Sequence, residues 1–202
     1  MTEPIAFDLY FDYICPYTQA ASVWARQLDE LLGDQVAITW RAFPIEQVNS
    51  PHGPEWLLWE QPEGGLSQGL LAFRAGKAAA RQAPAAFNRF HHAMIDLRRI
   101  SRRTLTRRAT LVQLANANGL DVERFERDLD DCALLTEIGE DYATGREQFG
   151  VFGTPTLVFP GGGSLYLQMT AAPPIEEAAT LLRGLAHMAS EQPYILEIKR
   201  PA

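Results

Sequence analysis

The chain has 202 residues, of which 47% are hydrophobic and 21% charged, and a formal net charge of −7 at pH 7. This length suits one well-buried domain with an elaboration, and the composition is that of a globular chain rather than a disordered one. The acidic balance argues against nucleic-acid binding. Met1 to Pro4 has no basic signal-peptide region, and no apolar run approaches the length of a membrane span. We therefore expect a cytoplasmic protein without a membrane partner.

The first part of the chain predicts a βαβ unit followed by a long loop. Ile5 to Phe11 is almost continuously apolar, as a strand buried on both faces is. A helix is predicted from Pro16 to about Leu32, where Gly33 ends it. Val36 to Phe43 is predicted to form a second strand, parallel to the first. Residues 44–65 are rich in proline and glycine, which predicts an irregular loop packed near a site.

Residues 66–149 have an almost wholly helical pattern, and strand character returns after Gly150. The helices are predicted at 66–83, 84–98, 106–118, 121–129 and 132–149. Two β-rich runs, 156–160 and 164–169, flank a glycine turn and predict an antiparallel hairpin, and a last helix follows from Pro173 or Pro174 to about Ser190. We expect an α/β fold in which 1–65 and 150–202 form one domain and 66–149 a helical insertion domain.

The stretch Phe11-Asp12-Tyr13-Ile14-Cys15-Pro16-Tyr17-Thr18 is predicted to deliver Cys15 from a strand onto the first turn of a helix. Pro16 fits that turn because its missing N–H would have no partner there. The positive end of the helix and its free N–H groups favour thiolate over thiol, so Cys15 is a candidate nucleophile. The spacing matches a C-x-x-C motif with Thr18 in place of the second cysteine. Cys15 therefore cannot close a local disulfide.

Three local matches, in the right order, resemble the DsbA family of thioredoxin-like proteins. They are Asp12-x-x-Cys15-Pro16-Tyr17, the length of the helical insert, and Phe149-Gly150-Val151-Phe152-Gly153-Thr154-Pro155-Thr156. The resemblance implies a thioredoxin-like core with a helical insertion domain, a DsbA-like fold. The last stretch is similar to the family's G-V-x-G-T-P-T, in which the proline is cis and faces the active thiol. Thr154 would then bind an extended substrate segment like an added strand, and Pro155 would leave the sulfur uncovered.

Thr18 sets the chain apart from most dithiol members and places it nearer the FrnE-like and 2-hydroxychromene-2-carboxylate isomerase-like branch. Relatives with Ser-Pro-Tyr at this place are the kappa-class glutathione transferases and those isomerases, and Cys15-Pro16-Tyr17-Thr18 looks like a hybrid of the two branches. The glutathione-binding relatives usually carry Gly-x-Asp-Arg after the last strand. Here the corresponding stretch is Gln168-Met169-Thr170-Ala171, which favours an oxidoreductase.

The resemblance implies a thiol–disulfide oxidoreductase in which Cys15 attacks a substrate disulfide. Thr18 can donate a hydrogen bond to the thiolate but cannot resolve a mixed disulfide, so an external thiol is needed. Glutathione or another low-molecular-weight thiol would be this cosubstrate, with no cofactor required, and the partners would be protein or small-molecule thiols and disulfides. A homodimer is left open. Two alternatives remain: a glutathione-dependent transferase or isomerase of the kappa or chromene type, and a redox-inactive peptide-binding module.

Other residues near the motif have candidate roles. Asp12 either modulates the thiol or hydrogen-bonds the strand end, and Pro16 and Tyr17 would line the substrate groove. Asn49 resembles a loop asparagine that helps hold glutathione in the kappa-class relatives. Cys132 is expected to be a buried small hydrophobe rather than a resolving thiol.

Two tryptophans, a pair of histidines and a cluster of arginines are expected to have mainly structural roles. Trp56 and Trp59 are expected either to wall the groove or to pack in the core, and the sequence leaves both possibilities open. The adjacent pair His91-His92 cannot chelate one metal well on a helix, so no metal site is predicted. A basic cluster is interpreted as solvated or paired with acids rather than as a nucleic-acid site; it comprises Arg98, Arg99, Arg102, Arg103, Arg107 and Arg108.

Overall fold

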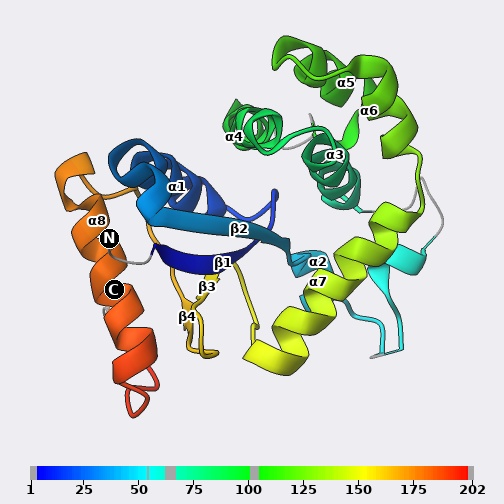
Figure 1. Ribbon diagram of the computed structural model, residues 1–202. Coiled ribbons are helices and arrows are strands. Elements are labelled where there is room, and N and C mark those ends of the chain that lie inside the picture. Colours follow the sequence, from blue (N-terminus) through cyan, green and yellow to red (C-terminus); the bar gives the residue numbers. More distant parts are fainter. Residues whose placement is uncertain (1–3, 54, 62–66, 101–104, 200–202) are drawn as a thin grey trace.

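The computed structural model describes residues 4–53, 55–61, 67–100 and 105–199 (Figure 1). Its strands are β1 (Ile5–Phe11), β2 (Val36–Ala42), β3 (Thr156–Val158) and β4 (Ser164–Tyr166). Its helices are α1 (Thr18–Leu32), α2 (Ile45–Val48), α3 (Leu70–Ala80), α4 (Pro84–Ile100), α5 (Arg108–Ala117), α6 (Val122–Leu129), α7 (Ala133–Phe149) and α8 (Ile175–Glu191), with short 3-10 turns at Gly33–Gln35 and Leu58–Glu60. Within these residues, none of the helices has the length and apolar character needed to cross a membrane.

The four strands form one mixed sheet in the order β2-β1-β3-β4. β1 and β2 are parallel and pair from Ile5 with Val36 to Phe11 with Ala42, which confirms the predicted βαβ unit. β3 and β4 form the predicted antiparallel hairpin. Gly161 in its turn has a φ of 91°, a conformation that side chains with a Cβ rarely adopt. Both hairpin strands are shorter than the sequence predicts.

The side chains of β1 alternate between two helical layers. Phe7 and Leu9 are buried in a cluster with α1 and α8, two helices joined by a hydrogen bond of 3.1 Å from Trp24 Nε1 to the Ala178 carbonyl. Tyr10 points to the opposite face and meets α7, where a Cβ added to Gly145 would lie 2.5 Å from the Tyr10 ring. The sheet is therefore sandwiched, and α7 lies close to it because residue 145 has no side chain.

The helical insertion has its own core, and α3 begins four residues later than predicted. Buried side chains of α3 to α7 pack together with Phe11 and Tyr13 from the end of β1. Glu46 accepts hydrogen bonds from the N–H groups of Gln68 and Gly69, and Ser67 Oγ accepts one from Leu70. These acceptors hold the chain before Leu70 outside the helix.

The later insert helices match the predictions except at Cys132. Asp121 accepts a hydrogen bond from the Arg124 N–H at 3.0 Å and is the N-cap of α6, as predicted. Cys132 is exposed, so the prediction of a buried small hydrophobe is wrong. It precedes the apolar stripe of α7, whose first buried residue is Leu134. Arg108 pairs with Asp130, as the acid-paired interpretation predicts. The side chains of Arg98, Arg99, Arg102 and Arg103 lie outside the part described.

His91 and His92 of α4 are buried where the insertion packs against the core. The Tyr13 hydroxyl lies 2.9 Å from His91 Nδ1, and the Ser22 hydroxyl lies 2.7 Å from His92 Nδ1. Burial lowers the pKa of His91 well below its usual value and lowers the pKa of His92 to about 4. Both rings are thus neutral packing groups at this interface. The described residues contain no group of three or more metal-ligating side chains.

We predict that His92 makes the fold sensitive to acid. The unfolded chain protonates this ring near 6.5 and the folded chain only near a pKa of about 4, so the unfolded state binds more protons between these values. The free energy of unfolding should therefore fall as pH is lowered through this window, by about 3 kcal/mol at pH 4 from this ring. Urea unfolding at pH 7.0, 5.5 and 4.5 measures the free energy of unfolding. In His92→Gln the part of its decrease that comes from this ring should be absent. His187→Gln, at an exposed position, should keep the wild-type slope, and a wild-type slope in His92→Gln would contradict the assignment.

Candidate active site

Cys15 lies in a tight turn between β1 and α1. Its N–H donates to the Asp12 carbonyl at 3.1 Å, and the first helical hydrogen bond runs from Ala21 N–H to the Tyr17 carbonyl. Because α1 begins at Thr18, the prediction of a helix from Pro16 with Cys15 on its first turn is wrong. The turn uses the Cys15 amide before the helix starts. The thiol is nevertheless just ahead of the N-terminal end of α1.

The structure brings Cys15 against the loop that precedes β3. Cys15 Sγ donates a hydrogen bond to the Thr154 carbonyl oxygen at 3.2 Å, and the Thr154–Pro155 peptide bond is cis. Cys15 is 5% exposed, so the expectation that Pro155 leaves the sulfur uncovered is wrong. A carbonyl can only accept, so this bond belongs to the protonated thiol and is lost when the thiol ionises. The neighbouring helix end acts in the opposite direction, because it favours the thiolate.

Asp12 is fully buried and holds the turn in place. Its carboxylate accepts hydrogen bonds from the Ile14 N–H at 2.8 Å and from the Ile45 N–H at 2.7 Å. The first bond fixes the Cys15 turn, and the second ties that turn to the segment after β2. A Cβ added to Gly69 would lie 3.4 Å from Asp12 Oδ1, so the approach to α3 packs here as well. Of the two roles considered for Asp12, these contacts show the hydrogen-bonding one.

Thr18 turns its hydroxyl to the backbone rather than to the sulfur. Thr18 Oγ1 accepts a hydrogen bond from the Asp12 N–H at 3.4 Å, and the side chain is buried. Among the described residues, no hydrogen bond joins Thr18 to Cys15. The predicted stabilisation of a thiolate by this hydroxyl is therefore not present in this arrangement.

Two aromatic side chains beside Thr154 were not expected from the sequence. Phe152 and Tyr166 are exposed, and their ring centroids are 4.9 Å apart. Tyr166 lies over the backbone at Gly153, where an added Cβ would be 3.1 Å from its ring. The pKa of Tyr166 is raised, chiefly by partial burial and also by the charges of Cys15 and Tyr17. The hairpin register, which pairs Thr156 with Tyr166, is the signal that could have located it.

The remaining candidates are more scattered. Pro16 is exposed and Tyr17 half-buried, as a groove lining would be. Asn49 is exposed at the end of α2, and its side chain forms no hydrogen bond within the described part of the chain. Trp59 packs against α7, since a Cβ at Gly139 would lie 2.5 Å from its Nε1.

The fold and the site together define a thioredoxin-like protein in which a cysteine after the first strand faces a cis-proline loop. A family model described as DSBA-like thioredoxin domain matches residues 6–183. The chain therefore belongs to the DSBA-like thioredoxin domain family.

Individual proteins are similar to this chain in sequence or in fold. An uncharacterized protein of Mycobacterium tuberculosis (strain ATCC 25618 / H37Rv), Rv2286c, is 28% identical over 199 residues, which cover 96% of this chain and 81% of that protein. The structure of MdbA, a thiol-disulfide oxidoreductase from Actinomyces oris, has a TM-score of 0.61 and 18% identity over 90% of this chain and 81% of that chain. The thiol-disulfide exchange protein alpha-DsbA2 from Wolbachia pipientis has a TM-score of 0.60 and 17% identity over 91% and 83% of the two chains. These two structures show a shared fold.

We predict that removing the Asp12 acceptors loosens the site and the fold. Asp12→Ala leaves the partly buried N–H groups of Ile14 and Ile45 without this acceptor, which should lower the free energy of unfolding by about 2 to 4 kcal/mol. Asp12→Asn, which keeps one carbonyl oxygen, should lose about half as much. Urea unfolding at pH 7 measures both, with the exposed Asp34→Ala as the control. A loss in Asp12→Ala no larger than in Asp34→Ala would contradict the role assigned to the carboxylate.

Proposed function

We propose that the protein is a thiol–disulfide oxidoreductase that acts through the single nucleophile Cys15. The observation that carries this proposal is the 3.2 Å contact between Cys15 Sγ and the Thr154 carbonyl beside Pro155. The family assignment supports it, and so do the activities for which MdbA and alpha-DsbA2 are named. The nucleophilic role of Cys15 and the monothiol mechanism are our inference from the residues.

The chemistry would be thiol–disulfide exchange. The Cys15 thiol loses its proton to solvent, and the thiolate attacks one sulfur of a substrate disulfide. A new disulfide forms between Cys15 and that sulfur, while the other substrate sulfur leaves as a thiolate. An external thiolate then attacks the Cys15 sulfur of the mixed disulfide, which releases the substrate sulfur as a thiolate and leaves Cys15 in a disulfide with the external thiol. A second external thiolate attacks the sulfur of that external thiol, forms the oxidised external disulfide and releases Cys15 as a thiolate. Glutathione or another low-molecular-weight thiol of a reducing cytoplasm fits this second step.

Substrate binding and activation of Cys15 are coupled in this proposal. An extended segment pairing with the backbone at Thr154 competes with Cys15 for the Thr154 carbonyl. Where a substrate N–H takes the place of the Cys15 S–H at that carbonyl, the thiol loses its acceptor. The N-terminal end of α1 is then the dominant influence on the sulfur, and it favours the thiolate.

The location of the second cysteine, Cys132, in the helical insertion also favours an external resolving thiol. Cys132 is a free, exposed thiol at the start of α7, and Cys15 is free in the turn before α1. Thr18 occupies the position from which a local partner would act.

We predict that Cys15→Ser loses disulfide reduction of a small peptide disulfide by about three orders of magnitude or more, since the nucleophile is removed. Wild-type activity should rise with glutathione concentration, because glutathione completes the cycle. Cys132→Ser is the matched control and should keep wild-type activity. Activity retained in Cys15→Ser would eliminate the mechanism. A glutathione conjugation rate that exceeds the disulfide reduction rate would instead favour the transferase alternative.

We also predict that Thr18→Cys restores an internal resolver. The new thiol stands three residues after Cys15, the spacing of a C-x-x-C disulfide, and attack by it would release substrate without an external thiol. Mass spectrometry after alkylation should show a disulfide between Cys15 and the introduced thiol, and single-turnover release of the reduced substrate should become independent of glutathione. Thr18→Ser, which keeps the hydroxyl, should retain the glutathione dependence. A Thr18→Cys protein with both thiols reduced and an unchanged dependence would contradict this interpretation of Thr18.

A further inference from the structure

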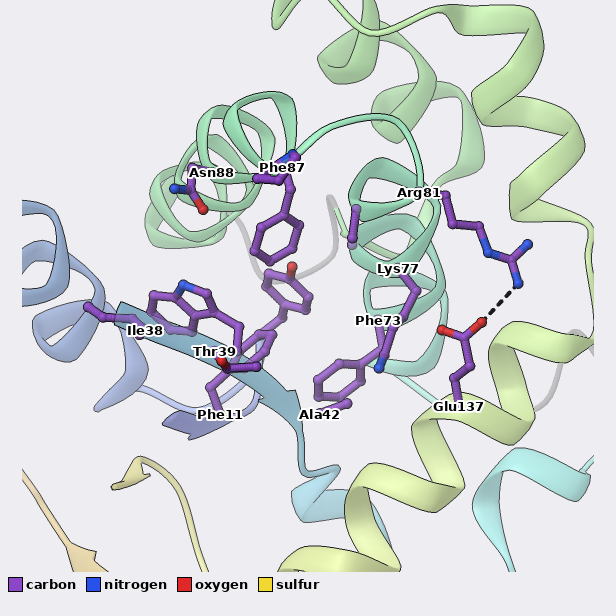
Figure 2. A pocket seen from close by; sticks show the side chains of 15 residues that line it. Phe11, Ile38, Thr39, Ala42, Phe73, Lys77, Arg81, Phe87, Asn88 and Glu137 are labelled. Carbon is purple, nitrogen blue, oxygen red and sulfur yellow. Dashed lines mark hydrogen bonds and ion pairs between the residues drawn. The ribbon is translucent and has the colours of Figure 1, made fainter. Parts of the chain in front are cut away.

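A cavity of about 490 Å³ lies along the free edge of β2, between the sheet and the helical insertion (Figure 2). Its wall includes the aromatic side chains Phe11, Tyr13, Trp40, Phe73 and Phe87. Cys15 and Thr154 are not among its lining residues. The cavity is therefore separate from the proposed active site.

The cavity meets the edge of β2 rather than one face of the sheet. Ile38, Thr39 and Trp40 all line it, although successive side chains of a strand point to opposite faces. A space that contacts all three must run along the strand edge. β2 is the last strand on this side of the sheet, because its one neighbour is β1.

Within the described part of the chain, Ile38 and Trp40 have backbone groups on that edge without hydrogen-bond partners. Phe43 N–H donates to the Phe11 carbonyl, toward β1, whereas Ala42 N–H donates away from β1 to Asp141 at 3.0 Å. Because N–H and C=O directions alternate along a strand, Ile38 and Trp40 also face away from β1. No hydrogen bond of the described residues takes up these outward groups of Ile38 and Trp40. Such an edge is a template for one more strand.

The C-terminal segment Pro193–Lys199 has the complementary properties. It forms no helix or strand, and Tyr194, Leu196 and Ile198 are 74%, 94% and 68% exposed. These three occupy alternate positions, so in an extended chain they share one face, while Ile195, which is 37% exposed, lies on the other with Glu197. Exposed apolar surface of this extent marks a contact site.

Length and charge also fit. Seven extended residues span roughly 23 Å, the length of the seven-residue β2. The segment carries Glu197 and Lys199 among its apolar residues. Lys77, Arg81 and Glu137 line the cavity, so its wall carries both signs of charge, with Lys77 paired to Asp141 and Arg81 to Glu137. Figure 2 shows Lys77 on α3 and Glu137 on α7, with a dashed line marking the ion pair of Arg81 and Glu137.

Two observations indicate that the segment would come from a second copy of the chain. The last turn of α8 lies against the β3–β4 turn, where a Cβ at Gly163 would be 2.3 Å from the Ala189 carbonyl oxygen. β4 and β2 are the opposite edges of the sheet, and Figure 1 shows α8 on the side of the sheet away from the insertion. We propose that Pro193–Lys199 of each protomer adds as a strand to the β2 edge of the other protomer. The result is a symmetric dimer with two exchanged segments.

Light scattering on the full chain and on a variant ending at Gln192 tests the dimer. The full chain should have twice the chain mass, and the truncated chain should be a monomer. A monomeric full chain, or a dimer that survives truncation, would overturn the proposal. Because Cys15 lies outside the cavity, the truncated chain should keep its disulfide reductase activity, so this test is independent of the proposed function.

A labelled peptide of residues 192–199, measured by fluorescence anisotropy on the truncated chain, tests the location. Ile38→Pro removes one outward N–H from the edge and should weaken binding about tenfold, whereas Ile38→Val should bind like the parent. A second test methylates the peptide backbone nitrogen of Leu196 or of Glu197. It needs no change in the protein, so it remains valid even if Ile38→Pro misfolds. One of these two adjacent methyl groups should abolish binding and the other should not, since successive N–H groups of a strand face opposite sides. Equal effects of both methyl groups, or no binding, would overturn the proposed pairing.

Discussion

The carboxylate of Asp12 is the interaction on which the site depends. It lies at the point where β1 ends, and it accepts N–H groups from the Cys15 turn and from the segment after β2. Two adjacent parallel strands therefore deliver their C-terminal ends to one buried acceptor. Breaking either bond leaves a buried polar group without this partner, which is costly, so the turn has little freedom to rearrange. Cys15 then has a fixed position opposite the Thr154 carbonyl.

That position gives the thiol two opposing influences. The Thr154 carbonyl accepts the S–H hydrogen and so holds the protonated form, while the N-terminal end of α1 favours the anion. In a dithiol site, a second cysteine can act on the sulfur directly. Here the Thr18 hydroxyl oxygen instead accepts a hydrogen bond from the Asp12 N–H. Under the proposed function, the substrate itself shifts the balance when it takes the Thr154 carbonyl, which couples reactivity to binding.

The framework of this fold was predictable because its signals are local. The apolar run Ile5–Phe11, the stripe of α1 and the glycine turn after Val158 each predict one element, and their order predicts the sheet. What could not be predicted depends on contacts across the chain. Glu46 takes up the N–H groups before α3 and delays that helix, and Tyr166 reaches the site only through the hairpin register. The prediction that Cys132 is buried is wrong because the apolar stripe of α7 starts two residues after it. The covering of Cys15 by the Thr154 loop likewise joins residues 139 positions apart.

The proposed mechanism requires that Cys15 forms a mixed disulfide with a substrate sulfur. The most direct measurement uses the full-length Cys132→Ser protein, in which Cys15 is the remaining cysteine. The protein is incubated with oxidised glutathione, digested and examined by mass spectrometry. We predict one glutathionyl adduct on the peptide containing Cys15, formed within the turnover time and removed by dithiothreitol. An unmodified Cys15 under these conditions would contradict the claim.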